Sequence, residues 1–175
     1  MPFFADTYRN LRKELDEQSV SLIAVSKFKS KAEILEAYQA GQYDFGENYV
    51  QELCEKQEKL PNDIRWHFIG HLQSNKVRFL DGFHLVHSVD RTSLADTISV
   101  WGMKRGMPID VLVQVNVVGE WTKGGYAPAM IEAEAARSNS NLAGLLFETS
   151  SGRRPDFHAL PRISIDLARE RPWRG

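Results

Sequence analysis

The chain has a single cysteine, Cys54, among its 175 residues, so it cannot form an intramolecular disulfide and a reducing compartment is expected. No apolar run approaches the roughly 20 residues that span a bilayer, and the N-terminal residues lack the apolar stretch of a secretory signal. The 22 basic and 23 acidic side chains nearly cancel, which removes any long-range attraction to nucleic acids or anionic membranes. These absences indicate a cytoplasmic globular protein without a nucleic-acid or membrane partner.

Several familiar motifs are also missing. The sequence contains no Gly-x-Gly-x-x-Gly segment and no Gly-Lys-Ser/Thr segment, which are the usual phosphate-binding motifs of open nucleotide-binding sheets. It contains no Gly-x-Ser-x-Gly nucleophile elbow. His67 and His71 are four residues apart but lack the glutamate of a His-Glu-x-x-His zinc site, so no metal site is expected.

The hydrophobic pattern alternates between short apolar runs and amphipathic segments along most of the chain. Such alternation predicts parallel βαβ units. Ser30, with Glu33 three residues later, has the pattern of a helix N-cap with a capping box, and Gly41 is expected to end that helix. The predicted strands are residues 20–26, 43–48, 65–70, 83–89, 108–118 and 142–147, and the predicted helices are residues 4–18, 30–42, 49–60, 74–82, 91–106 and 127–139.

Two architectures fit this order of elements, an open doubly wound sheet and a TIM-type (β/α) barrel. The missing glycine-rich motifs remove the common reasons for an open nucleotide-binding sheet, so the pattern favours the barrel. In a barrel, functional side chains project from the C-terminal ends of the strands. Polar residues follow five of the predicted strands, namely Lys27, Asn48, His67 and Gly70, Ser88 and Asp90, and Asn116, Glu120 and Lys123.

Lys27 directly follows the apolar run of the first strand, in the segment LIAVSKFKS. A partly desolvated lysine beside other cations, such as Lys29 and Lys123, has a lowered pKa and can act as a nucleophile. Such an amine can form a Schiff base with the aldehyde of pyridoxal 5'-phosphate (PLP). The alternative is a strand-end lysine that extends its charge into water. Position alone favours this second interpretation.

Several motifs together favour the interpretation of Lys27 as a reactive lysine. The segments AVSKFKS, FGENYVQE, WHFIGHLQSNKV, VHSVDR and QVNVVGEWTKGGY resemble, in order and spacing, the PLP homeostasis protein family, which is similar to the N-terminal barrel domain of alanine racemase. The resemblance extends to about Gly144 and implies a (β/α)8 barrel that holds PLP as a Schiff base. It implies a non-catalytic protein that stores PLP or delivers it to PLP-dependent apo-enzymes, as a monomer or weak homodimer.

The resemblance assigns residues to the cofactor site. It implies that Lys27 forms the Schiff base, that Asn48 lines the cofactor, and that His67 lies where the third strand opens on the pocket. Lys123 matches a second lysine, at the place of a racemase arginine that faces the phenolic oxygen of the cofactor. The expected accessory residues are Lys29, Ser88 and Asn116.

The C-terminal part departs from the family pattern. The Leu-Ser-x-Gly-Met-Ser segment and the last strand of the family are not found, and residues 145–175 have an unrelated composition. We therefore expect a PLP-binding barrel portion of about six βα units over residues 1–144 and a truncated or divergent tail over residues 145–175. The phosphate of a barrel ligand rests on the loops after strands seven and eight, so weak or absent PLP binding is expected. The alternatives are a fragment of a racemase-like PLP enzyme and a remnant that binds nothing.

Overall fold

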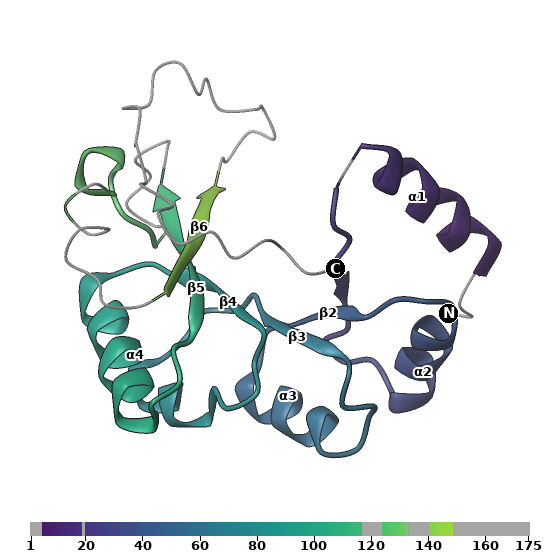
Figure 1. Cartoon of the computed structure of the whole chain (residues 1–175), viewed down its shortest axis with the longest axis horizontal. Coiled ribbons are helices and arrows are strands. Elements are labelled where there is room, and N and C mark those ends of the chain that lie inside the picture. Colours follow the sequence, from purple (N-terminus) through teal and green to yellow (C-terminus); the bar gives the residue numbers. More distant parts are fainter. Residues whose placement is uncertain (1–4, 19, 117–123, 132, 134–140, 149–175) are drawn as a thin grey trace.

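The computed structural model describes residues 5–18, 20–116, 124–131, 133 and 141–148, and residues 141–148 are described by their backbone. It shows one curved sheet with helices packed along it (Figure 1). Within these ranges no helix is both long and apolar enough to cross a membrane. The predicted helix at residues 127–139 is described only in part, as a short 3-10 helix at Pro128–Met130 followed by Ile131.

Six parallel strands form the sheet, and their order in space is their order along the chain. A doubly wound sheet would reverse its order at a switch point, so this consecutive order confirms the barrel-type arrangement. The sheet is not closed, because within the described ranges nothing pairs with the outer edges of β1 and β6. The strands are β1 (Ala24–Val25), β2 (Asp44–Glu47), β3 (Arg65–Phe68), β4 (Leu85–Val89), β5 (Asp110–Asn116) and β6 (Asn141–Glu148).

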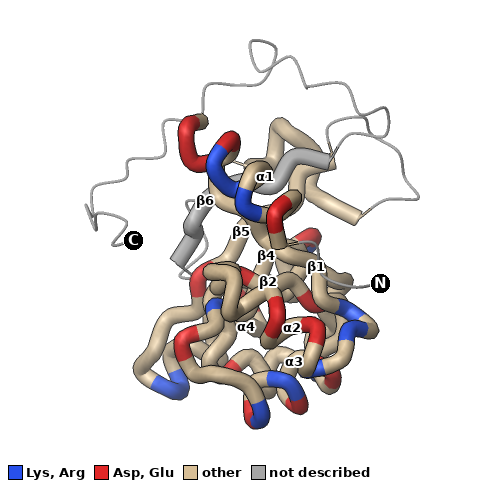
Figure 2. Tube along the Cα trace, turned by 90° about the vertical axis from the view of Figure 1, so that its right-hand side faces the viewer, with Lys and Arg blue, Asp and Glu red and all other residues tan. Residues whose placement is uncertain are grey.

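The helices lie where the sequence pattern predicts them. Figure 1 shows α2, α3 and α4 along one face of the curved sheet, while α1 lies beyond β1 and α2. Charges of both signs are interspersed along these helices (Figure 2), without a continuous basic stripe on the described residues. Their bounds are α1 (Ala5–Glu17), α2 (Lys31–Gln39), α3 (Val50–Gln57), the 3-10 helix η1 (Ser74–Phe79) and α4 (Thr92–Arg105).

The hydrophobic core lies between the sheet and α2, α3, η1 and α4, and it is built around the large buried side chains of Phe45, Trp66 and Phe68. Strand β5 shows how the two faces of the sheet differ. Its valines are buried against the helices, whereas alternate residues such as Leu112 and Gln114 are only half-buried on the inner face. The inner face of β5 is therefore less covered than the face that packs against the helices.

Two boundaries differ from those expected. β1 has only two residues in the ladder with β2, Ala24–Val25, and the Ser26 backbone N–H, just beyond them, also donates to the Gly46 carbonyl of β2. β6 runs from Asn141 to Glu148 and so crosses the expected boundary between residues 144 and 145. The division into a barrel portion and a tail stays a prediction, since residues 149–175 lie outside the described ranges.

The capping box that begins α2 is present. The Ser30 hydroxyl accepts a hydrogen bond from the Glu33 backbone N–H, and the Glu33 carboxylate accepts one from the Ser30 backbone N–H. We expect Ser30→Ala to lower the free energy of unfolding by about 1 kcal/mol, because an N–H group of the first turn loses its acceptor. Urea denaturation measures this change. Ser99→Ala, within α4, is the control and should change stability by less than about 0.5 kcal/mol; an equal effect of both variants would contradict the prediction.

Candidate functional site

Four of the residues expected at the site lie at one edge of the sheet. Lys27 follows β1, Asn48 follows β2, Ser88 lies near the end of β4 and Asn116 ends β5. Because all strands are parallel, their carboxyl ends share an edge, and the structure brings these four positions to it. Lys123, another of the seven expected residues, lies outside the described residues.

Lys27 is exposed and lies in the turn between β1 and α2. The residue before it, Ser26, is buried, and its backbone N–H donates to the carbonyl of Gly46 on β2. The residue after it, Phe28, has a left-handed backbone with φ of 61°. The lysine side chain is thus presented to solvent from a turn whose first residue is fixed to the sheet.

Lys29 has a partner of its own. Its ammonium lies 2.9 Å from Glu33 Oε1 at the start of α2. The hydrogen bond from Lys29, together with those from Ser30, lowers the pKa of Glu33 to about 2. A cation already matched by a carboxylate acts less on a neighbouring lysine, so the suggested role of Lys29 beside Lys27 gains no support from this arrangement.

Asn48, Gly70 and Ser88 join the ends of β2, β3 and β4. The backbone of Gly70 lies so close to Asn48 that a Cβ atom on Gly70 would be 2.7 Å from the Asn48 Cα atom. The hydroxyl of Ser88, which is buried, donates to the carbonyl of Gly70. A glycine is required at this close approach, and Ser88 acts here by fixing the backbone that supports Asn48.

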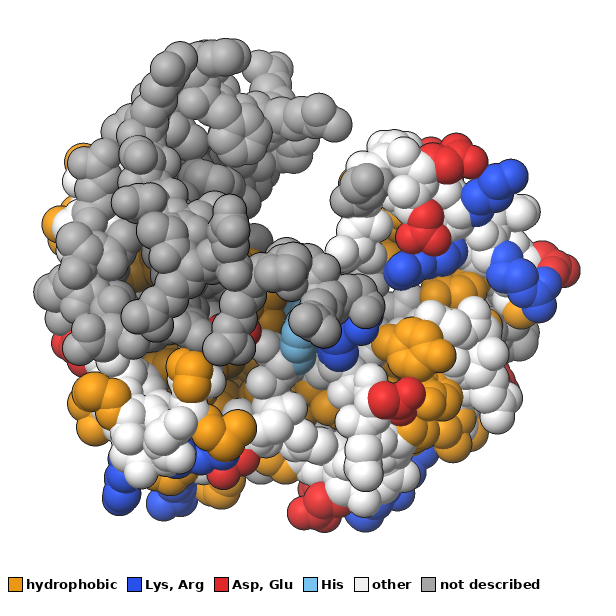
Figure 3. Space-filling model, viewed as in Figure 1, with side chains coloured by type: hydrophobic (Ala, Val, Ile, Leu, Met, Phe, Trp, Pro, Cys, Tyr) orange, Lys and Arg blue, Asp and Glu red, His pale blue; other side chains and the backbone are white. Residues whose placement is uncertain are grey.

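His67 lies on the inner face of the sheet, within β3. Val25, Gly46 and His67 occupy one row across β1, β2 and β3. His67 is therefore about two residues, or roughly 6.5 Å, nearer the N-terminal ends of the strands than Lys27. Its partners also lie on this inner face, which Figure 3 shows hollowed beside α1.

Both ring nitrogens of His67 are engaged by neighbouring strands. Nε2 lies 3.0 Å from Asp44 Oδ1 and Nδ1 lies 2.9 Å from His87 Nε2. An ionised carboxylate only accepts, so His67 Nε2–H is the donor to Asp44, whereas the tautomers of the two rings decide which nitrogen donates between His67 Nδ1 and His87 Nε2. His67 was expected at the cofactor pocket, but these contacts describe a hydrogen-bonded link between β2, β3 and β4.

The same carboxylate is held by Arg65. The Arg65 guanidinium donates to Asp44 at 2.7 Å and 2.5 Å. Burial alone would raise the pKa of Asp44, but the hydrogen bonds from Arg65 and His67 outweigh it and hold this pKa well below its usual range. Desolvation, followed by the neighbouring His67, lowers the pKa of His87 to about 4 and also lowers the pKa of His84.

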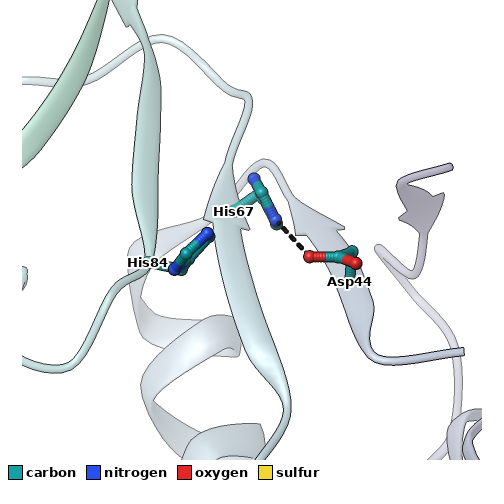
Figure 4. Close-up of side chains that lie close together, drawn as sticks. All are labelled: Asp44, His67 and His84. Carbon is teal, nitrogen blue, oxygen red and sulfur yellow. Dashed lines mark hydrogen bonds and ion pairs between the residues drawn. The ribbon is translucent and has the colours of Figure 1, made fainter. Parts of the chain in front are cut away.

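Asp44, His67 and His84 lie close enough together for a cation (Figure 4). However, both Asp44 oxygens already accept hydrogen bonds from Arg65, and both His67 nitrogens have partners. The group also begins at the N-terminal ends of the strands, where residues of a barrel serve stability. We interpret this group as a structural hydrogen-bonded network.

Sequence reasoning missed a buried ionic group beneath the turn of Lys27. Lys56 Nζ donates to the Ser26 carbonyl at 2.7 Å, to Glu47 Oε1 at 2.7 Å and to Glu52 Oε1 at 2.8 Å. The Ser26 hydroxyl donates to Glu47 Oε1 at 2.6 Å. We call Ser26, Glu47, Glu52 and Lys56 the Lys56 cluster. The i,i+4 spacing of Glu52 and Lys56 on α3 was the available signal, but it is common on solvated helix surfaces.

A second ionic group lies at the rim beyond β4. Asp90 binds Arg91 at 2.6 Å and lies 3.3 Å from His71 Nδ1. Arg91 also donates to the Leu72 carbonyl at 3.1 Å. These contacts tie the loop after β3 to the loop after β4.

With this geometry established, similarity to known proteins is informative. Residues 4–150 match the family described as the N-terminal domain of alanine racemase. A Pseudomonas aeruginosa protein named pyridoxal phosphate homeostasis protein is 45% identical over 137 residues, covering 75% of this chain and 60% of that protein. An Aquifex aeolicus protein of the same name is 39% identical over 165 residues, covering 88% and 72%.

The chain belongs to the pyridoxal phosphate homeostasis protein family. This confirms the resemblance found in the sequence. The chain spans 60% of the length of the P. aeruginosa protein and 62% of the Bos taurus protein of the same name.

Solved structures agree on the family and the fold. PipY of Synechococcus elongatus without PLP superposes with a TM-score of 0.77 at 36% identity, covering 87% of this chain and 74% of PipY. PipY with PLP bound gives a TM-score of 0.75 at 38% identity, covering 85% and 72%. A histidine racemase from Leuconostoc mesenteroides, at 11% identity and a TM-score of 0.60, shares the fold alone.

Proposed function

We propose that this chain binds PLP as a Schiff base on Lys27 and takes part in PLP homeostasis as a binding protein. One observation carries the proposal. Lys27 is an exposed lysine at the carboxyl edge of a consecutive parallel sheet, and hydrogen bonds hold the peptide groups on both sides of it. The name shared by the relatives and the PipY structure with PLP bound support the choice of cofactor.

The residues present fit the covalent part of a PLP site. PLP supplies an aldehyde, which an amine can hold, and a ring that accepts electrons. Lys27 would hold PLP through its side-chain amine, as a reversible Schiff base. Asn48 and Asn116, at the same edge, offer polar groups beside Lys27, whereas loops of the kind that hold a phosphate in barrels are not among the described residues.

We also propose that the protein has no turnover reaction of its own. A racemase requires an acid or base opposite the lysine, able to exchange a proton with the substrate. The side chains of Asn48, Ser88 and Asn116, which share the edge with Lys27, do not ionise near neutral pH. The ionisable Asp90 at the same rim is paired with Arg91 and His71. Their chemistry favours holding the cofactor over transforming a substrate.

The remaining parts of the proposal follow from the family and the composition. We place the protein in the cytoplasm, as a monomer or weak homodimer, with PLP-dependent apo-enzymes as recipients of its PLP. A Schiff base is reversible by hydrolysis, so PLP held in this way can be released again. Release is what a storage or delivery role requires.

The experiment that tests the proposed function adds PLP to the purified chain and follows the Schiff-base absorbance. The loaded chain is then mixed with the apo form of a PLP-dependent enzyme, whose recovered activity reports the transfer. We expect a saturable signal, transfer of PLP, and no racemisation of alanine by the chain itself. Racemisation of alanine would assign the protein to the enzymes, and the absence of any saturable signal would overturn the proposal.

A further inference from the structure

The turn that carries Lys27 has an unfavourable backbone conformation. Phe28 has φ of 61°, and it is the one non-glycine residue with positive φ in the part of the chain that the structure describes. This left-handed conformation costs energy for a residue with a Cβ atom. The Phe28 side chain is 76% exposed and contacts Tyr49 at a ring-centroid distance of 5.5 Å. Contacts elsewhere in the turn must therefore maintain its shape.

Two side chains of α3 hold the peptide groups on either side of Lys27. On one side, the Ser26 carbonyl accepts from Lys56 Nζ at 2.7 Å. On the other side, the Phe28 N–H donates to Glu52 Oε1 at 2.6 Å. Lys56 Nζ donates to the same Glu52 oxygen at 2.8 Å. One ammonium and one carboxylate thus fix the backbone of the turn from below.

The Lys56 cluster is poorly suited to a role in stability alone. The Glu47 side chain has no exposed surface and that of Lys56 is 7% exposed. Glu47 Oε2 is buried without a hydrogen-bond partner among the described residues. Burial of charges costs solvation energy that their attraction often does not recover, and an unpaired buried oxygen adds to that cost. The cluster fixes the backbone geometry of the turn that carries Lys27.

We propose that Lys56, Glu47 and Glu52 are positioning residues for Lys27, a role that rests on the proposed function. Lysine has a long, flexible side chain, so Nζ can be aimed at an aldehyde only when its backbone origin is fixed. Glu47 orients Lys56 and Ser26, and Lys56 and Glu52 then hold the two peptide groups that flank Lys27. Small displacements of a reacting group lower rates strongly. The cluster therefore acts on the rate and yield of Schiff-base formation without touching PLP.

The test compares Glu52→Leu with Glu52→Gln. Glutamine keeps an oxygen that can accept from the Phe28 N–H, whereas leucine removes it. We expect Glu52→Leu to slow Schiff-base formation and to weaken apparent PLP affinity by about tenfold, with Glu52→Gln within about twofold of the parent. Glu47→Leu combined with Lys56→Met is a second variant, which we expect to fold because apolar replacement of a whole buried pair is often neutral. It should show a similar loss.

Two further measurements separate positioning from stability and from the proposed function. Ile98→Val, on the buried face of α4, is the control for lowered stability and should leave PLP binding unchanged. Hydrogen exchange of the Phe28 amide, measured without PLP, should be faster in Glu52→Leu and unchanged in Glu52→Gln. Equal PLP binding by Glu52→Leu and the parent, or equal losses in both Glu52 variants, would overturn the inference. If the parent forms no Schiff base the proposed function fails, and an unchanged Phe28 exchange rate overturns the positioning role separately.

Discussion

Replacing Lys27 by alanine is expected to abolish the Schiff-base absorbance that PLP produces with this chain. The other two lysines beside Lys27 at this edge of the described sheet are less available to PLP. Lys29 is paired with Glu33, and Lys56 is buried under the turn. A Schiff base requires an accessible amine that can lose its proton. Titration with PLP, followed by absorbance and by the mass of the reduced adduct, measures the effect.

Lys29→Ala is the matched control for Lys27→Ala. It removes an exposed lysine two residues away, and we expect it to leave the absorbance in place. If Lys29→Ala lost the signal and Lys27→Ala kept it, the assignment of the lysine would be wrong.

The strength of PLP binding is a separate quantity. Charge-assisted hydrogen bonds to phosphate contribute about 1.5–3 kcal/mol each, and the described residues contain no phosphate-binding loops after a seventh or eighth strand. The loss of two such bonds amounts to about 3–6 kcal/mol, so we expect this 175-residue chain to bind PLP at least about 100-fold more weakly than PipY. Titrating both proteins side by side measures the ratio, and equal affinities would show that this chain holds the phosphate by other means.

The free energy of unfolding is expected to fall by roughly 1.5–2 kcal/mol between pH 7 and pH 4.5, chiefly through His87. Desolvation and the neighbouring histidines lower its pKa from 6.5 to about 4 in the folded protein. The unfolded chain therefore binds the proton more readily, and stability falls as the pH drops below about 6.5. Each pKa unit corresponds to about 1.4 kcal/mol, reduced here because solvent screens a partly exposed ring.

Urea unfolding followed by tryptophan fluorescence, to which the buried Trp66 contributes, measures this pH dependence. His87→Gln keeps polar groups that can bond to His67 Nδ1 but does not titrate, so its stability should depend less on pH. His71→Gln changes a histidine whose side chain is 68% exposed, and its pH dependence should match that of the parent. Carboxylates titrate mainly below pH 4.5, so the chosen range isolates the histidines. An unchanged slope in His87→Gln would contradict the assignment.

Local features could be predicted from the sequence because their causes are local. The capping box of Ser30 and Glu33, the glycine after α2 and the alternation of strands and helices each depend on neighbouring residues. The placement of Lys27 at the carboxyl edge followed from the same alternation. Parallel strands joined by helices always place their carboxyl ends together.

Features set by pairing between strands could not be predicted in this way. Whether His67 faces the cofactor or Asp44 depends on the register of β2 and β3, which no short segment determines. Glu47 precedes Asn48 in a motif that drew attention to Asn48, yet Glu47 points the other way, toward α3 and Lys56. Successive residues of a strand point to opposite faces of the sheet. Glu47 therefore contributes to the Lys56 cluster rather than to the expected PLP site.

The consecutive strand order also bears on how the molecule is assembled. Each strand pairs with the one made just before it, so the sheet can grow in step with synthesis, from the N-terminus onward. Within the described sheet, β1 stays at the edge, with two residues paired to β2. A strand at the margin is the part of a sheet most open to pairing with another chain. The turn of Lys27 follows this strand directly. The shape of the turn during synthesis therefore depends on α3, which leaves the ribosome after α2.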